Sequence, residues 1–388
     1  MRLLVAGGRL QGTEAAYLAR EAGWEVLVAD VDSEAPAAGL CDEFLLVDIT
    51  DEWALKRALR GVDLVVPALE DLEVLPVLER VSHGEGVPIA YDPRAYRISS
   101  CKIKSDRLFA EQGVPAPRPG ARTFPVIAKP SGSSGSDGVR RFGDEGEFQR
   151  FKVNMGKGLS GWVIQEYLEG PSYSLEVVGT GLHFRTLQVT QLEMDPLYDC
   201  KRVLAPADLE TPLVEALRAD TVRLARAMGL VGVMDIEVIL NSGRLQALEI
   251  DARLPSQTPT AVYKSSDQNL LEWLKEVFVD GRLPEAGIRV KRAVIYEHVW
   301  AHDGVLEVTG EHIMGTGGHL SHRRGFFGAC EALTNFRGPW LPWVATLINT
   351  GSTMEEAWAA RDSAVRGIMA HCGLGVLLDE GPHEEGGT

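Results

Sequence analysis

The sequence predicts an α/β protein with an N-terminal layered domain and two later lobes of mixed helix and strand. Short apolar runs alternate with helical periodicity through residues 1–92, a pattern that favours a parallel sheet covered by helices. Residues 124–139 form an apolar run that ends in a lysine and is followed by glycines and serines. Residues 233–251 alternate acidic and apolar side chains in two expected strands joined by a tight turn.

The first 92 residues are predicted to form an open, Rossmann-like unit. Its glycine turn, Gly7-Gly8-Arg9-Leu10-Gln11-Gly12, carries Arg9 where a dinucleotide fingerprint has its second glycine. Asp30 ends the second strand, where such a fingerprint places its ribose-binding acid. Binding of NAD is therefore a minor alternative. The expected strands are 2–6, 25–30, 43–47 and 64–67, and the expected helices are 11–23, 52–60 and 72–82.

The rest of the chain is expected to form two further domains and a tail. A helix over 99–112 ends at Gly113, and short antiparallel strands then surround the glycine loop. Other expected elements are helices at 147–153, 208–228 and 353–371 and strands at 162–165, 233–240, 244–250 and 293–300. We place the domains at 1–92, 93–182 and 183–378, with 379–388 as a disordered, acidic tail.

Composition limits the classes of function. A net charge of −16 over 388 residues argues against a nucleic-acid partner, while leaving room for a small anion held by local lysines. No apolar run approaches the ~20 residues that span a bilayer, so no membrane partner is expected. The N-terminus shows no signal-peptide pattern, and five scattered cysteines form no CxxC pair. We therefore expect a cytoplasmic protein with reduced thiols.

The lysine-and-glycine segment at 124–139 predicts an anion site. An unpaired lysine at the end of a buried strand is costly, and a glycine and serine loop lets backbone N–H groups approach a phosphate. The order differs from a Walker A loop, where the lysine follows the glycines. A nucleotide site of another design is the working hypothesis, and a surface loop with an incidental lysine is the alternative.

The acidic hairpin is the second strong signal. Residues two apart in a strand share a face, so Asp235 and Glu237 lie together, as do Glu249, Asp251 and Arg253. Carboxylates gathered on one face repel each other unless cations lie among them, and hard oxygen ligands of this kind suit Mg²⁺. A sheet face whose charges are hydrated by water is the alternative.

A third segment, residues 163–170, resembles a hinge between two lobes. Its extended backbone offers N–H and C=O groups to an adenine edge, while Tyr167 and Leu168 pack nearby. Apolar strands that end in Glu-Gly are frequent, so this segment is a weak signal when taken alone.

Taken in order, these features resemble the ATP-grasp superfamily over roughly residues 1–285. The resemblance implies an ATP-grasp fold and two Mg²⁺ ions bound by Glu237, Glu249 and Asp251. Two departures are Asp251, where the superfamily often has asparagine, and Ser172, where it often has glutamate. The ATP contacts that the resemblance implies are Arg9, Lys102, Lys129, Ser131, Gly132, Ser133, Ser134, Gly135, Glu166, Tyr167 and Leu168.

A closer resemblance comes from residues 249–260, which read EIDARLPSQTPT. This segment, together with 7–12, 174–177, 198–200 and 295–298, is similar to the ligases of pyrrolysine biosynthesis, with Arg9 where a lysine is usual. The resemblance implies that ATP activates the carboxylate of 3-methyl-D-ornithine as an acyl phosphate, which the ε-amine of lysine attacks. Lys129 and Arg253 are the catalytic candidates, although Arg253 could instead be a structural partner of Asp251.

The substrate candidates follow from the charge of a diamino acid and from the edge of the parallel sheet. Acids and hydroxyls are expected around the ornithine-like amines, and residues at the carboxyl ends of the first-domain strands are expected to hold lysine. Glu70 has an equally weighted alternative as part of a solvated loop or helix cap. The full set is Leu10, Gln11, Glu70, Ser174, Glu176, Asp235, Asp251, Arg253, Ser256 and Thr258.

Two other classes of function stay open at this stage. One is another carboxylate–amine ligase of the same fold, of the dipeptide or D-alanine type, for which the acidic substrate candidates are a poor match. The other is a redox or non-enzymatic Rossmann protein, which the incomplete glycine fingerprint disfavours. No general base for the attacking amine is identified, and the oligomeric state, a homodimer included, is left open.

Overall fold

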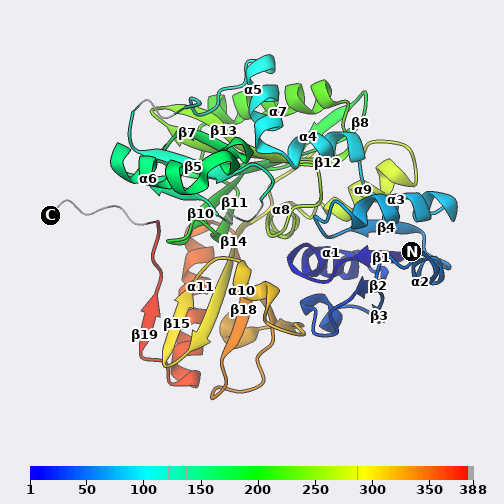
Figure 1. The fold of residues 1–388 in the computed structure, drawn as a ribbon. Coiled ribbons are helices and arrows are strands. Elements are labelled where there is room, and N and C mark those ends of the chain that lie inside the picture. Colours follow the sequence, from blue (N-terminus) through cyan, green and yellow to red (C-terminus); the bar gives the residue numbers. More distant parts are fainter. Residues whose placement is uncertain (121–122, 134, 136–137, 286, 383–388) are drawn as a thin grey trace. The chain divides into compact units, whose positions relative to one another are not determined.

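The computed structural model describes residues 1–388 except 121–122, 134, 136–137, 286 and 383–388 (Figure 1). Its internal contacts divide the chain into two compact units. The first unit comprises Met1–Tyr91, Thr190–Ala207 and Leu254–Thr388, and the second comprises Asp92–Val189 and Asp208–Arg253. The division into three domains stays a prediction. Within the described residues, no helix is both long enough and apolar enough to cross a membrane.

The first unit opens with the expected parallel sheet, in the strand order β3-β2-β1-β4 (Figure 1). Continuous apolar runs form these strands because both faces of a parallel sheet are buried, and Leu3, Leu4 and Val5 have no exposed surface. The strands are β1 (Arg2–Ala6), β2 (Glu25–Asp30), β3 (Glu43–Leu46) and β4 (Leu64–Pro67). The helices are α1 (Leu10–Glu21), η1 (Pro36–Gly39), α2 (Glu52–Ala58) and α3 (Val74–Gly84).

Asp30 has a structural partner in the glycine turn. Its carboxylate accepts hydrogen bonds from the N–H of Gly8 at 2.6 Å and from the N–H of Asp32 at 2.9 Å. Gly12 allows the close turn, because a Cβ there would lie 2.2 Å from the carbonyl oxygen of Gly7. The acid that suggested a ribose contact therefore holds the turn itself.

The remainder of the first unit is an antiparallel sheet in the order β10-β11-β14-β18-β17-β16. β15 pairs with β14, and β19 pairs in parallel with β15. Helix α11 packs on β18 and β14, and α8 contacts β11 and β14. The strands are β10 (Thr190–Met194), β11 (Cys200–Ala205), β14 (Ala293–His302), β15 (Val305–Val308), β16 (Ser321–Arg324), β17 (Glu331–Thr334), β18 (Trp343–Gly351) and β19 (Val376–Leu378). The helices are α8 (Thr258–Ser266), α9 (Leu270–Phe278), α10 (His312–Gly315), η3 (Phe326–Gly328) and α11 (Met354–Cys372).

A buried ion cluster, here named the Arg202 cluster, lies in this part of the first unit. Arg202 and Arg361 both donate to Glu297, at 2.9 Å and 2.7 Å. Asp379, which we expected in a disordered tail, pairs with Lys201 at 2.7 Å and with Arg202. These buried cations bind the carboxylate of Asp379, and the disorder of the tail stays a prediction. The cluster comprises Glu193, Lys201, Arg202, Glu297, Arg361 and Asp379.

The second unit contains a three-stranded sheet, β6-β5-β7, and the strands β13-β12-β8, with β9 paired to β8. Its strands are β5 (Val126–Pro130), β6 (Arg140–Phe142), β7 (Trp162–Glu166), β8 (Ser172–Thr180), β9 (Phe184–Thr186), β12 (Val231–Asn241) and β13 (Arg244–Asp251). Its helices are α4 (Pro93–Ser99), α5 (Lys102–Gln112), α6 (Glu145–Met155), η2 (Gly156–Gly161) and α7 (Thr211–Met228).

One expected helix begins later than predicted. The sequence predicted a helix over 99–112, whereas α5 begins at Lys102 and a separate short helix, α4, precedes it and ends at Ser99. The start of α5 is held by the glycine loop, because Ser131 accepts the N–H of Lys102 at 2.9 Å through its carbonyl oxygen and the N–H of Ile103 at 3.3 Å through its hydroxyl. Lys102 consequently lies in the first turn of α5, beside the loop.

Candidate functional site

Three neighbouring strands of the second unit bring acidic side chains into two rows. In the register of β8, β12 and β13, Asp235 is opposite Glu176 on one side and Asp251 on the other. Two residues along, Glu237 is opposite Ser174 and Glu249. Directly opposed residues share a face of the sheet, so all six lie on one face. We name them the Asp235 row (Glu176, Asp235, Asp251) and the Glu237 row (Ser174, Glu237, Glu249).

The Asp235 row is buried and strongly acidic. Glu176 has no exposed surface and Asp235 is 7% exposed. Burial and the neighbouring Asp251 carboxylate raise the pKa of Asp235 well above its ordinary value, while Arg253 opposes this effect. Arg253 lies 3.2 Å from Asp251, and Oδ1 of Asp235 has no hydrogen-bond partner among the described residues. A cationic ligand would relieve this row.

The Glu237 row lies beside two lysines. Nζ of Lys102 is 2.5 Å from Oε1 of Glu249 and 2.5 Å from the carbonyl oxygen of Ser133. Burial and the Glu249 carboxylate raise the pKa of Glu237 to about 7. Burial lowers the pKa of Lys129; Glu249 opposes this shift and Lys102 adds to it. Both lysines predicted to contact phosphate are therefore close to the acidic face.

The donor set of the two rows fits Mg²⁺. Five carboxylates face only three cationic groups, and carboxylate oxygens are the ligands that Mg²⁺ prefers. The predicted ligands Glu237, Glu249 and Asp251 do not converge on one point, because Lys102 holds Glu249. Within the described ranges, two sets of three acidic or histidine side chains have possible metal-ligand atoms within 4.8 Å of one another. Both sets lie in the first unit.

The glycine loop begins at a fixed residue. Ser131 is 9% exposed and its hydroxyl binds the start of α5, so this predicted phosphate contact holds the loop in place. Gly132 and Gly135 are exposed, and Gly135 has a φ of 59°, a conformation that favours glycine. Ser134, another predicted ATP contact, lies outside the described residues.

The hinge is partly occupied by its own neighbours. The N–H of Glu166 donates to the carbonyl oxygen of Arg118 at 3.0 Å, and the N–H of Tyr167 donates to the carbonyl oxygen of Pro125 at 3.2 Å. The carboxylate of Glu166 pairs with the Arg118 side chain at 2.7 Å. Of the three predicted adenine contacts Glu166, Tyr167 and Leu168, Leu168 is the one whose N–H has no hydrogen-bond partner among the described residues.

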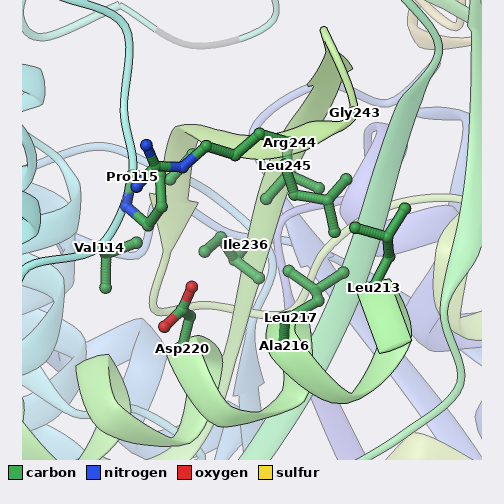
Figure 2. Close-up of a pocket in the computed structure, with 12 residues that line it drawn as sticks. Val114, Pro115, Leu213, Ala216, Leu217, Asp220, Ile236, Gly243, Arg244 and Leu245 are labelled. Carbon is green, nitrogen blue, oxygen red and sulfur yellow. The ribbon is translucent and has the colours of Figure 1, made fainter. Parts of the chain in front are cut away.

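The opposite face of the hairpin carries an apolar pocket (Figure 2). Ile236 and Val238 alternate with the acidic residues of β12 and line this pocket with Leu213 and Leu217 of α7. The pocket is therefore separated from the acidic rows by the thickness of the sheet.

The predicted lysine-binding residues lie in the first unit. Nε2 of Gln11, in the first turn of α1, donates to Oε1 of Glu70 at 2.8 Å, so the structure brings these two together. Leu10 is partly buried beside them at the start of α1. Arg9 is mostly exposed and lies 4.0 Å from Asp32.

The predicted substrate residues are divided between the units. Ser256 and Thr258 belong to the first unit, whereas the rest of the ornithine-binding set belongs to the second. The carbonyl oxygen of Ser256 accepts the N–H of Thr258 at 2.8 Å, and Oγ1 of Thr258 is buried without a hydrogen-bond partner among the described residues.

Sequence reasoning missed two residues near α8. Gln257 has a φ of 70°, which is unusual for a residue with a side chain, and its buried Oε1 has no hydrogen-bond partner in the described residues. Glu14 is 2% exposed, accepts the N–H of Thr260 at 2.6 Å, and has a pKa that burial raises to about 8. Only the position of Gln257 inside the 249–260 motif could have drawn attention to it.

Two families match the chain in consecutive segments. Residues 99–257 match the ATP-grasp domain, and residues 3–90 match the PylC-like N-terminal domain. These matches agree with the lysines, glycine loop and acidic hairpin already described. The protein is an ATP-grasp enzyme, an ATP-dependent carbon–nitrogen ligase.

Curated relatives specify the family. The 3-methyl-D-ornithine–L-lysine ligase of Methanosarcina mazei is 35% identical over 373 residues, 96% of each chain. The enzyme of the same name from Methanosarcina acetivorans is 37% identical over 318 residues, 81% of this chain and 84% of the relative. This chain belongs to the family of 3-methyl-D-ornithine–L-lysine ligases.

Solved structures agree at the level of the fold. The biotin carboxylase domain of 2-oxoglutarate carboxylase from Hydrogenobacter thermophilus, solved with MgADP, has a TM-score of 0.73 at 16% identity and covers 94% of this chain and 89% of its own. An L-amino acid ligase from Bacillus licheniformis has a TM-score of 0.67 at 16% identity, covering 94% and 97%. The predicted ATP-grasp fold is confirmed.

Proposed function

We propose that this chain joins 3-methyl-D-ornithine to the ε-amine of L-lysine at the expense of ATP, as a step of pyrrolysine biosynthesis. The family membership supports these substrates. The carboxylate of the ornithine accepts the γ-phosphoryl group and becomes an acyl phosphate. The lysine amine then displaces phosphate and forms an amide, with ADP and phosphate as the other products.

The observation that carries this proposal is the division of the acidic face into two rows. The Glu237 row lies beside Lys102 and Lys129, a combination that suits nucleotide phosphates with two Mg²⁺ ions. The Asp235 row has three carboxylates and one arginine, a combination that suits the two ammonium groups of a diamino acid. One sheet face thus holds the anionic and the cationic substrate side by side.

Each side chain has a role that follows from its charge. Lys102 and Lys129 neutralise the phosphates, and Gly132, Ser133 and Gly135 of the glycine loop contact them. Glu237, Glu249 and Asp251 would hold Mg²⁺, which would supply positive charge for phosphoryl transfer when bound. Arg253, 3.2 Å from Asp251, stabilises the oxyanion that develops when the amine attacks. Leu168 and Tyr167 receive the adenine.

The amine substrate binds in the first unit. Gln11 and Glu70, already joined at 2.8 Å, present an amide and a carboxylate to the lysine, with Leu10 against its aliphatic stem. Ligands of open α/β sheets bind at the carboxyl ends of the strands, and Glu70 follows β4 at that end.

A second candidate is a ligase of the same fold for small neutral amino acids, such as a D-alanine type. The similarity to the L-amino acid ligase extends to the fold. Three carboxylates in the Asp235 row are unsuited to alanine, which offers one ammonium group. This observation favours the diamino acid.

The test is an assay of phosphate release. Purified protein with Mg-ATP should release phosphate only when D-ornithine, or its 3-methyl form, and L-lysine are present together. Release with D-alanine alone, or no release with any pair, would contradict the proposal.

Variants of the two rows test the division of labour. Glu176→Gln should raise the KM for the ornithine about 10-fold or more and leave the KM for ATP within about 2-fold, because one charge-assisted contact to substrate is lost. Glu237→Gln should instead raise the KM for ATP about 10-fold or more and leave the KM for the ornithine within about 2-fold. Equal effects of both variants on both substrates would refute the assignment of separate rows.

A further inference from the structure

A histidine and a buried carboxylate form a dyad in the first unit, outside the acidic rows. Nδ1 of His312, in α10, lies 2.6 Å from Oδ2 of Asp199, which precedes β11. The Asp199 side chain is 11% exposed and the His312 side chain is 55% exposed. A buried acceptor thus holds an imidazole whose far edge faces outward.

The carboxylate of the dyad is fixed by its own surroundings. Asp195 accepts the N–H of Asp199 at 3.0 Å and the N–H of Gly310 at 3.0 Å, which ties the turn before β11 to the segment before α10. The backbone N–H of His312 also donates to Oδ2 of Asp199, at 3.1 Å. A Cβ at Gly310 would lie 2.2 Å from that oxygen, so the two segments meet through glycine.

This geometry selects one tautomer of the imidazole. A ring N–H at Nδ1 that donates to a carboxylate leaves Nε2 as a proton acceptor. The hydrogen bond to Asp199 raises the pKa of His312, which makes Nε2 more basic. The charged and titratable groups around the ring are Asp195, Asp199, His298 and Glu307.

Helix α10 packs against the amine subsite of the proposed function. α10 contacts α1, and a Cβ at Gly315 would lie 3.6 Å from Cγ of Leu10. His312 is three residues before Gly315, about one helical turn away. Leu10 and Gln11, which we assign to the lysine substrate, therefore lie beside the helix that carries the imidazole.

Two other histidines of the first unit are less suited to accept a proton from a ligand. His298 is 2% exposed, and burial lowers its pKa to about 4. His319 bonds the carbonyl oxygen of Ser33 at 2.6 Å through Nε2. His312 combines an oriented ring, a buried partner and a side chain that is about half exposed.

We propose that His312 is the general base for the attacking amine and that Asp199 is its positioning residue; this rests on the proposed function. As the lysine nitrogen forms its bond to the acyl carbon, the bond from that carbon to the phosphate oxygen breaks and phosphate leaves with the electron pair. The ε-ammonium gives up two protons overall. One ends on the departing phosphate, and the other goes to Nε2 of His312, which releases it to solvent.

The experiment compares two nucleophiles on one variant. Hydroxylamine is uncharged at neutral pH and attacks an acyl phosphate without a base, so it reports formation of the acyl phosphate alone. His312→Gln should lower lysine-dependent turnover about 100-fold or more, the range expected for loss of a general base, and leave hydroxamate formation from D-ornithine and ATP within about 3-fold. His322→Gln is the control, because His322 also pairs with a carboxylate, Glu331, at 2.8 Å.

The pH profile adds a readout that a structural role would not move. The wild-type lysine rate should level off above the pKa of His312, whereas the rate of the His312→Gln variant should keep rising about 10-fold per pH unit as free amine accumulates. In Asp199→Asn the inflection of the lysine rate should lie at lower pH than in the wild type, because the hydrogen bond that raises the pKa of His312 is lost. Lysine turnover retained in His312→Gln, or equal loss with both nucleophiles, would overturn the proposal. A wild-type protein that forms neither amide nor hydroxamate would refute the proposed function, and the base with it.

Discussion

The acidic rows of the second unit and the Arg202 cluster of the first contain the same kinds of charged side chain in opposite states. In the Arg202 cluster three cations meet three carboxylates, and pairing with Arg202 and Lys201 outweighs burial and lowers the pKa of Asp379. In the acidic rows five carboxylates meet three cations, and the pKa values of Asp235 and Glu237 are raised. The charges of the Arg202 cluster are balanced within the protein, whereas the acidic rows carry excess negative charge that a cationic ligand would balance.

This difference shows how burial of charge can serve stability or binding. A paired cluster is destabilised when one partner is removed, because the remaining charges stay buried. A cluster with excess like charge weakens the fold until a counter-charge arrives, so its cost is recovered as affinity for cations. The four predictions below test this contrast, in order of decreasing effect.

The largest effect is expected in the Arg202 cluster. Glu297→Ala should lower the free energy of unfolding by about 3–5 kcal/mol, because it leaves Arg202 and Arg361 buried without their shared partner. Urea unfolding measures the loss. The surface pair Arg80–Glu52, 2.6 Å apart and about half exposed, is the control, and Glu52→Ala should cost less than about 1 kcal/mol. Equal losses would contradict the contrast.

Next is an effect on catalysis. Glu249→Gln should reduce turnover about 100-fold or more, because a ligand of Mg²⁺ and the partner of Lys102 is lost, while the fold stays intact. Phosphate release and circular dichroism together check this. The exposed Glu169, three residues beyond Glu166, offers a matched Glu→Gln control on the hinge. Wild-type turnover in Glu249→Gln would remove the metal assignment.

A smaller effect comes from a lone buried carboxylate. Glu14 has a folded-state pKa of about 8 against an ordinary value of 4.5, so its contribution to stability is full below pH 4.5 and is lost as pH rises through about 8. Between pH 5 and 7 the free energy of unfolding should fall by about 2 kcal/mol through this residue, and Glu14→Gln should remove that slope. Thermal melts of both proteins at several pH values measure this slope. Equal slopes of stability against pH in the two proteins would refute the raised pKa of Glu14.

The smallest expected effect is a gain in stability. Glu237→Gln should stabilise the metal-free protein by about 1 kcal/mol at pH 8, because it removes one charge from the acidic face. The same variant should lose the stabilisation that Mg-ATP gives to the wild type. Melting in chelator and in Mg-ATP separates the two effects. A loss of stability in chelator would show that the carboxylate is structurally paired.

The hairpin could be predicted because its information is local. Asp235, Glu237, Glu249 and Asp251 lie within one pair of strands joined by a tight turn, so alternation alone places them on one face. The parallel sheet of the first unit was predictable for the same reason, since each apolar run stands between helical patterns. The pairing of Gln11 with Glu70 was expected from the common edge of β1 and β4.

Features that depend on distant segments were not predictable. The Arg202 cluster joins residues between Glu193 and Asp379, and no local pattern predicts that they pair with one another. The break between α4 and α5 arises because Ser131, some thirty residues later, binds the new helix start. The dyad of Asp199 and His312 has the same origin, with 113 positions between its members.

The order of segments within the two units has a consequence for synthesis on the ribosome. Every residue of the second unit, from Asp92 to Arg253, has been made while more than half of the first unit, Leu254–Thr388, is still missing. β10 and β11 must wait for β14, which pairs with β11 and is translated nearly ninety residues later. Domains generally fold as units while the chain emerges, so the unit that holds most of the ATP-grasp match completes its fold before the unit to which we assign the lysine substrate.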